Sequence, residues 1–186
     1  CNKFQPEWKV WEQYVTDNLQ RALNLDSLRS SHPIEVPVNN ADEINQIFDA
    51  ISYSKGSSLL RMISKWLGEE TFIKGVSGDL WDALADASGK DVCSVMNIWT
   101  KRVGFPVLSV KEHKNKITLT QHRYLSTGDV KEEEDTTIYP ILLALKDSTG
   151  IDNTLVLNEK SATFELKNEE FFKINGDQSG IFITSY

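Results

Sequence analysis

The sequence predicts an α+β protein in two parts, with helices over residues 1–104 and a seven-stranded β-sandwich over residues 105–186. Before Gly104, apolar residues recur every three to four positions, which is typical of amphipathic helices. After Pro106 they alternate, in short runs separated by Asn and Gly, which is typical of strands and turns. Because the period changes at Gly104, we place the boundary between the two parts there.

In the first part, Pro6 suits the first turn of a helix, whereas Pro33 and Pro37 make residues 26–40 an irregular connector. Asp42 can cap a short helical turn, and Gly68 and Gly104 are suited to end helices. Helices are expected over residues 6–25, 53–67, 79–87 and 91–103, with the short turn at residues 43–47.

The second part contains seven short runs with a period of two, which at this spacing favours a sandwich. Four consecutive carboxylates at residues 132–135 are interpreted as a solvated loop, because a calcium loop needs spaced ligands and a turn glycine. The strands are expected at residues 107–110, 117–121, 138–145, 154–157, 162–166, 171–174 and 180–184.

Composition excludes several classes of protein. The net charge of -7 over 186 residues and the absence of a basic cluster argue against a nucleic-acid partner. No run of about 18 apolar residues exists that could cross a membrane. Only two cysteines, Cys1 and Cys93, are present, which favours a reducing, cytoplasmic location, with Cys93 a small buried residue. The first residue is not Met, and the chain ends after a strand-like run, so we expect a piece of a longer polypeptide.

Residues 48–67 combine a tyrosine with an amphipathic helix. From Ser57 onward, the apolar residues follow helical spacing, and Tyr53 falls where an irregular segment is expected to become that helix. Gly56 costs about 1 kcal/mol relative to alanine, so packing or close approach of another group should offset it. On these residues alone, Tyr53 is more readily part of the structure than a working residue.

No complete catalytic or metal-binding set is present in the sequence. It contains no H-E-x-x-H, Cys-x-x-Cys, glycine-rich phosphate loop or G-x-S-x-G turn. The three histidines, His32, His113 and His122, are scattered. They are interpreted as surface or hydrogen-bonded residues rather than metal ligands.

Four motifs together resemble the gluzincin-type zinc aminopeptidases, the family of aminopeptidase N and puromycin-sensitive aminopeptidase, with the yeast cytosolic members most similar. They are F-D-A-I-S-Y-S-K-G at residues 48–56, S-H-P-I at 31–34, D-L-W at 79–81 and the junction from W-T at 99–100 to G-F-P-V at 104–107. The resemblance covers the whole chain. It departs from the family between Ser77 and Gly78, where relatives carry about a dozen more residues.

The resemblance implies roles for particular residues. Tyr53 would donate a hydrogen bond to the oxyanion of the reaction, and Phe48 would line the substrate pocket, although an apolar residue there could equally be core. Lys55 and Gly56 would support the turn that carries Tyr53, and His32 would shape the wall of the site. The zinc ligands and the general base would all precede Cys1, so no metal ligand is expected within this chain.

The resemblance also implies the fold and activity of the whole. The chain would be the helical second half of a thermolysin-like domain followed by the β-sandwich. The parent would be a zinc aminopeptidase acting on peptides, with further domains of the same polypeptide as partners, and the 186 residues alone would be inactive. Two alternatives stay open: a non-catalytic structural unit that positions neighbouring domains, and a pseudo-enzyme without the metal motif.

Overall fold

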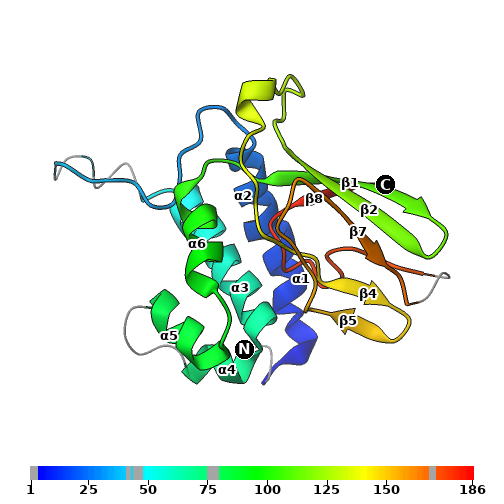
Figure 1. Cartoon of the computed structure of the whole chain (residues 1–186). Coiled ribbons are helices and arrows are strands. Elements are labelled where there is room, and N and C mark those ends of the chain that lie inside the picture. Colours follow the sequence, from blue (N-terminus) through cyan, green and yellow to red (C-terminus); the bar gives the residue numbers. More distant parts are fainter. Residues whose placement is uncertain (1–3, 41–42, 44–47, 75–79, 168–170) are drawn as a thin grey trace.

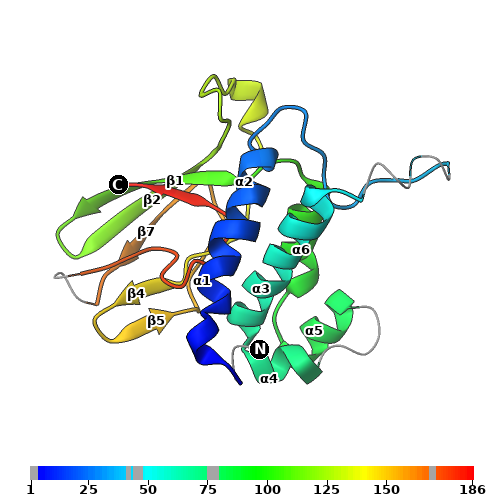
Figure 2. The ribbon, with the colours of Figure 1, turned by 180° about the vertical axis from the view of Figure 1, so that it is seen from behind.

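The computed structural model describes residues 4–40, 43, 48–74, 80–167 and 171–186. Helices occupy one side of the molecule and strands the other, as predicted for an α+β protein (Figure 1). In the two opposite views, the long N-terminal helix runs between the remaining helices and the strands (Figures 1 and 2). The mixed architecture expected from the sequence is therefore confirmed.

The N-terminal helix begins later than the sequence predicted. Pro6–Trp8 forms a 3-10 turn, and Lys9 then takes a left-handed conformation with φ 48°. From Val10 the chain is continuously helical, as α1 (Val10–Tyr14), a π-helical segment (Val15–Leu19) and α2 (Gln20–Asp26). The predicted helix over residues 6–25 is thus confirmed from Val10 onward.

The helix that carries Tyr53 begins earlier than the sequence predicted. It is helical from Ala50, passes through a π-helical segment (Ile51–Lys55) and continues as α3 (Gly56–Leu67). Asp49 starts it, because its carboxylate accepts the Ser52 N–H at 3.0 Å and its carbonyl accepts the Tyr53 N–H at 3.1 Å. Tyr53 therefore lies in the first turn of the helix, which begins three residues before the predicted start at Tyr53.

The remaining helices follow the prediction with one addition. Gly68, with φ 84°, ends α3, and a short helix that was not predicted, α4 (Glu69–Lys74), follows at once. Next come α5 (Leu80–Ser88) and α6 (Val92–Lys101), and the Asp91 carboxylate caps α6 by accepting the Ser94 N–H at 3.0 Å. Of the predicted turn at residues 43–47, only Glu43 is described, and Asp42 and the Ser77–Gly78 link lie outside the described residues.

The described residues contain eight strands in three sheets rather than seven in a sandwich. The largest sheet has the order β7-β2-β1-β8, and only its β1–β8 pair is parallel. It consists of β1 (Pro106–His113), β2 (Lys116–Arg123), β7 (Ser161–Glu165) and β8 (Ile183–Ser185). The two small sheets pair β3 (Ile141–Leu142) with β6 (Val156–Leu157), and β4 (Leu145–Asp147) with β5 (Gly150–Asp152).

Three differences from the predicted strands account for the change from seven strands to eight. The run at residues 138–145 is interrupted because Ala144 has φ 43°, so that β3 and β4 join different sheets. The strand β5 follows a two-residue turn in a region where a loop was expected. Residues 171–174 form no strand in the described part of the chain and contribute only an isolated bridge between Lys146 and Lys173.

The hydrophobic core continues across Gly104. Trp99 of α6 is fully buried, its ring lies 4.7 Å from the ring of Tyr139, and its indole N–H donates to the Pro140 carbonyl at 3.0 Å. The Tyr139 hydroxyl donates in turn to the Val103 carbonyl at 2.9 Å. One cluster of packed side chains includes Leu59, Ile63, Leu84, Met96, Trp99, Phe105, Leu108, Leu119, Ile141 and Leu157. Division into domains 1–104 and 105–186 stays a prediction.

The acidic run is not simply a solvated loop. Glu132–Glu134 is a 3-10 turn, and Glu134 accepts two hydrogen bonds from Arg29, at 2.8 and 2.9 Å. The hydrogen bond from Arg29, together with that from the Lys131 N–H, lowers the pKa of Glu134 to about 2. Asp135 accepts from Lys160 and from the Arg123 N–H, each at 2.6 Å. These carboxylates link the loop after α2 to the strands.

Candidate functional site

Tyr53 and Phe48 form an exposed aromatic pair on the helical part. Their side chains are 62% and 61% exposed, and their ring centroids lie 6.2 Å apart. Within the described residues, the Tyr53 hydroxyl has no hydrogen-bond partner. This exposure leaves the phenol of Tyr53 able to donate to a ligand.

A pocket of about 370 Å³ lies beside Tyr53. Its wall is mostly apolar and includes Ile34, Leu60, Trp81 and Met96. Gly56 also borders it, and a Cβ atom built on Gly56 would meet no atom within 4 Å. The expectation that close approach of another group offsets the cost of Gly56 was therefore wrong for the described residues; the absence of a side chain there leaves pocket space open.

His32 connects the S-H-P-I loop to the start of the Tyr53 helix. Its Nε2 lies 2.7 Å from Oδ2 of Asp49, and its Nδ1 lies 2.8 Å from the Pro33 carbonyl oxygen. Asp49 Oδ1 accepts the Ser52 N–H, so the same carboxylate holds both the loop and the first turn of the helix. The expected role of His32 in shaping this region has a structural basis in these contacts.

The charges of this pair stabilise each other. Burial lowers the pKa of His32, but the hydrogen bonds to the Pro33 carbonyl and to Asp49 outweigh it, and the pKa is raised on balance. For Asp49, burial raises the pKa, but hydrogen bonds from the Ser52 N–H and from His32 lower it on balance. The ion pair therefore favours the imidazolium and the carboxylate together.

Lys55 lies on the inner side of the same helical turn. Its side chain is fully buried, and its Nζ lies 2.7 Å from Oδ2 of Asp26, which is also buried. Lys55 Nζ donates further to the carbonyl oxygens of Gly104 at 3.2 Å and Arg102 at 3.4 Å. Burial lowers the pKa of Lys55, and the attraction and hydrogen bond of Asp26 oppose that shift. The supporting role expected of Lys55 is thus an ion pair in the interior.

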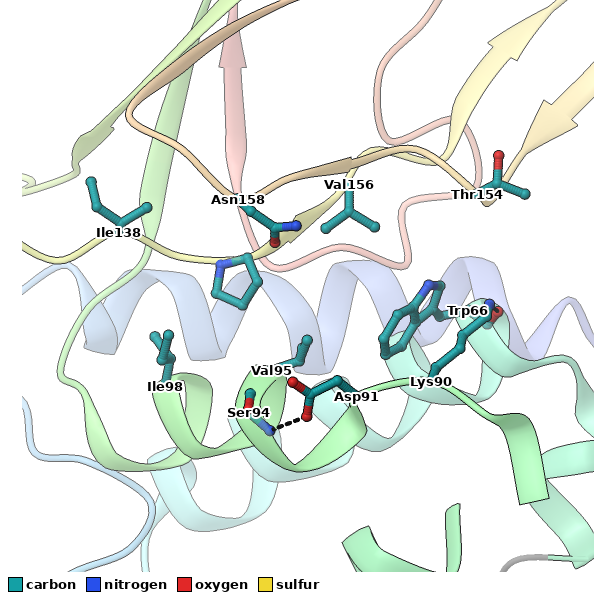
Figure 3. A pocket seen from close by; sticks show the side chains of 11 residues that line it. Trp66, Lys90, Asp91, Ser94, Val95, Ile98, Ile138, Thr154, Val156 and Asn158 are labelled. Carbon is teal, nitrogen blue, oxygen red and sulfur yellow. Dashed lines mark hydrogen bonds between the residues drawn. The ribbon is translucent and has the colours of Figure 1, made fainter. Parts of the chain in front are cut away.

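A larger pocket lies elsewhere and contains none of the predicted site residues. It has a volume of about 690 Å³ and lies between the start of α6 and the segments around β3 and β6 (Figure 3). Its polar groups are engaged locally: Asp91 caps α6, and Lys90 donates to the Trp66 carbonyl at 3.0 Å. Ser94, Val95 and Ile98 line it, whereas Met96 and Thr100, on another face of α6, line the Tyr53 pocket. The candidate site is therefore the pocket at Tyr53.

The described residues offer no metal site of their own. Among them, no three His, Cys, Asp or Glu side chains gather closely enough to hold a metal ion. His32 and His122 are each paired with one carboxylate, Asp49 and Asp135, at 2.7 and 2.8 Å. Their interpretation as hydrogen-bonded residues is confirmed.

The sequence analysis missed two residues of this site. Asp26 and Asp49 make the ion pairs that hold the Tyr53 helix, yet neither stood out in the sequence. Asp49 could have been found as a capping residue, since Asp is favoured directly before a helix. Asp26 gave no signal, because a carboxylate at the end of a helix is ordinarily exposed.

Comparison with known proteins gives one family model, Peptidase family M1 domain, which matches residues 1–99. The chain is 94% identical to "Alanine/arginine aminopeptidase" of Saccharomyces cerevisiae and 72% identical to "Aminopeptidase 2, mitochondrial" of the same yeast, with all of the chain aligned in both cases. It is 38% identical to "Aminopeptidase M1" of Arabidopsis thaliana over 97% of the chain.

The chain spans between a fifth and a quarter of the length of these relatives, 23%, 21% and 23% respectively. The alignment with the first yeast protein is 199 positions long, 13 more than the 186 residues of the chain. A gap of that size agrees with the dozen residues expected between Ser77 and Gly78. In the part of the chain that the structure describes, no helix is long and apolar enough to cross a membrane.

Proposed function

Because the chain belongs to peptidase family M1, as the resemblance predicted, we propose that it is part of a zinc aminopeptidase that removes single residues from the amino termini of peptides. The names of the three relatives support aminopeptidase activity in the parent polypeptide. The observation that carries the proposal to this chain is the exposed Tyr53 beside an apolar pocket. We propose a cytoplasmic location as well, although one yeast relative is named as mitochondrial.

Tyr53 acts in this proposal as the donor to the oxyanion. When water adds to the carbonyl carbon of the scissile peptide bond, the carbonyl oxygen gains negative charge. A phenol with a pKa near 10 is neutral at pH 7 and donates one hydrogen bond to that oxygen. Support comes from the unpartnered Tyr53 hydroxyl within the described residues.

Phe48 contributes binding surface in this proposal. Its ring lies beside that of Tyr53 and is more than half exposed, so it can cover an apolar side chain of the substrate. The exposure argues against the alternative that Phe48 is a core residue. Peptide substrates and the remaining domains of the same polypeptide are the proposed partners.

Zinc is proposed as the cofactor of the parent, but the described residues do not fit it, since they hold no cluster of metal-binding side chains. We place the ligands in the part of the polypeptide before Cys1. The 186 residues alone are then inactive, and their structural contribution is the wall that bears Tyr53. Hydrolysis of an aminoacyl anilide by the isolated chain would contradict this assignment.

The decisive experiment compares Tyr53→Phe with the wild type in the full-length polypeptide. We expect kcat to fall by about 10² or more, with zinc content and thermal stability unchanged. Tyr124→Phe is a matched control, because it removes the same atom from a tyrosine whose ring stacks on Phe105. An unchanged kcat for Tyr53→Phe would remove Tyr53 from the mechanism, and absence of zinc-dependent activity in the wild type would favour the pseudo-enzyme alternative.

A further inference from the structure

We propose that Lys55 and Asp26 are positioning residues, which hold the Tyr53 side chain in its working orientation through a buried ion pair. The inference rests on the proposed role of Tyr53 as oxyanion donor. Neither residue touches the pocket beside Tyr53, so the effect must pass through the helical turn that carries both Lys55 and Tyr53.

The two side chains leave the same π-helical segment on different sides. Tyr53 is 62% exposed, whereas Lys55, two residues later, is fully buried. Both side chains extend from one five-residue segment, and π-helical turns of this kind are frequent at functional sites. An inner contact that fixes Lys55 therefore also fixes the rotation of the turn and the direction of Tyr53.

The ion pair has several partners that limit its movement. Asp26 Oδ2 lies 2.7 Å from Lys55 Nζ, and Asp26 Oδ1 accepts the Gly104 N–H at 3.0 Å and the Ser31 hydroxyl at 2.7 Å. Lys55 also donates to the Gly104 carbonyl. The Tyr53 turn is thus tied at one point to the end of α2, to the S-H-P-I loop and to the start of the strands.

A contribution to stability does not by itself explain why Lys55 and Asp26 form a buried ion pair here. A buried ion pair recovers in attraction little more than it loses in hydration, and apolar residues of similar volume commonly stabilise a core as well or better. Charged partners instead fix the position of the side chain, because an ammonium group surrounded by fixed oxygen atoms has one preferred position. This favours a role in setting geometry.

The same helix offers a matched comparison. Arg61 of α3 is another largely buried cation, but it donates to the carbonyl oxygens of Asp177 and Gln178 near the C-terminus. It has no contact with the Tyr53 turn among the described hydrogen bonds. Loss of Arg61 should lower stability without changing the orientation of Tyr53.

The test uses the full-length polypeptide with Lys55→Met, the double variant Asp26→Asn with Lys55→Met, Tyr53→Phe, and the combination of all three. The double variant leaves no unpaired buried charge, so it is expected to fold even where Lys55→Met alone does not. For the double variant we expect kcat to fall about tenfold or more, with KM and zinc content unchanged. In the Tyr53→Phe background the same two changes should lower kcat far less.

A second readout does not depend on activity. With 3-fluorotyrosine at position 53, the fluorine resonance should be single in the wild type and in Arg61→Met, and shifted or split in the double variant. An unchanged resonance, or an equal loss of kcat with Tyr and with Phe at position 53, overturns the proposal. If Tyr53→Phe has wild-type kcat, the proposed role of Tyr53 fails, whereas the fluorine spectra still decide whether the ion pair orients the ring.

Discussion

His32 lies with both ring nitrogens against oxygen acceptors, Nε2 at 2.7 Å from the Asp49 carboxylate and Nδ1 at 2.8 Å from the Pro33 carbonyl. A neutral imidazole can donate from one nitrogen only, so two oxygen acceptors at these distances favour the protonated ring. Proton binding at His32 is therefore coupled to the contact between the S-H-P-I loop and the helix that bears Tyr53.

This contact should make stability depend on pH in a defined window. Because the pKa of His32 is raised in the folded state, its contribution to stability is complete below pH 6.5, the ordinary pKa of histidine. That contribution is lost as the pH rises through the pKa of the folded state. The lowered pKa of Asp49 means that its contribution is present above 3.8 and is lost as pH falls through the folded value. Both contributions are present between about pH 4 and 6.5.

We accordingly expect His32→Gln to lower the thermal midpoint most near pH 5 and least above pH 8. Thermal melts of the full-length variant and wild type across that range measure the difference. His113→Gln, at the exposed end of β1, is the control and should show no such dependence. A loss that is constant from pH 5 to pH 8 would mean that the charge of His32 does not support the fold.

Phe48→Ala should weaken substrate binding with little effect on stability. Because the ring is 61% exposed, its removal leaves no buried cavity. For substrates with large apolar amino-terminal residues, we expect KM to rise about tenfold, equivalent to about 1.4 kcal/mol, with kcat nearly unchanged. Steady-state kinetics with leucyl and alanyl anilides test this, and a lowered thermal midpoint with normal KM would instead make Phe48 a structural residue.

Gly56→Ala should stabilise the protein. The residue has helical angles, φ -58° and ψ -48°, and a Cβ atom there meets nothing within 4 Å. The gain in helix propensity is about 1 kcal/mol, measurable by denaturant unfolding. Because the new methyl group would enter the pocket beside Tyr53, we also expect KM to change, an effect that the gain in stability would not cause by itself. A destabilised variant would show that a group outside the described residues occupies that space.

Gly176→Ala should have the opposite effect on stability. A Cβ atom there would lie 2.5 Å from Lys146 Cβ and 3.1 Å from the Ala144 carbonyl oxygen, and the backbone oxygen cannot move aside without loss of a hydrogen bond. We expect the free energy of unfolding to fall by about 1 to 3 kcal/mol. The same denaturant experiment as for Gly56→Ala measures it, and a neutral result would mean that the loop after Asn175 adjusts freely.

The sequence predicted what depends on local pattern and missed what depends on distant contacts. The stripe of α3, the start of α6 near Asp91 and the glycine at the end of α3 are each determined by residues within one or two turns. The parallel pairing of β8 with β1 and the left-handed Ala144 depend on segments far away in the sequence. No periodicity rule contains that information.

The candidate site shows the same division. Tyr53 and Phe48 could be proposed because both lie in a motif that resembles one of the family. Lys55 was assigned to support without a partner, since nothing in the sequence indicates that Asp26 turns inward at the end of α2. The direction of a side chain at a helix end is decided by tertiary packing, which sequence spacing does not record.

The core that runs through Trp99, Tyr139 and Phe105 joins the helices and the strands in one margin of stability. A substitution that destabilises a strand then lowers the same free energy of unfolding as a substitution beside Tyr53. We expect the helices and the strands to unfold together in a single calorimetric transition. Mutations tolerated in the strands would consequently restrict which mutations the region around Tyr53 can accept. The strands limit the evolutionary freedom of a site they do not line.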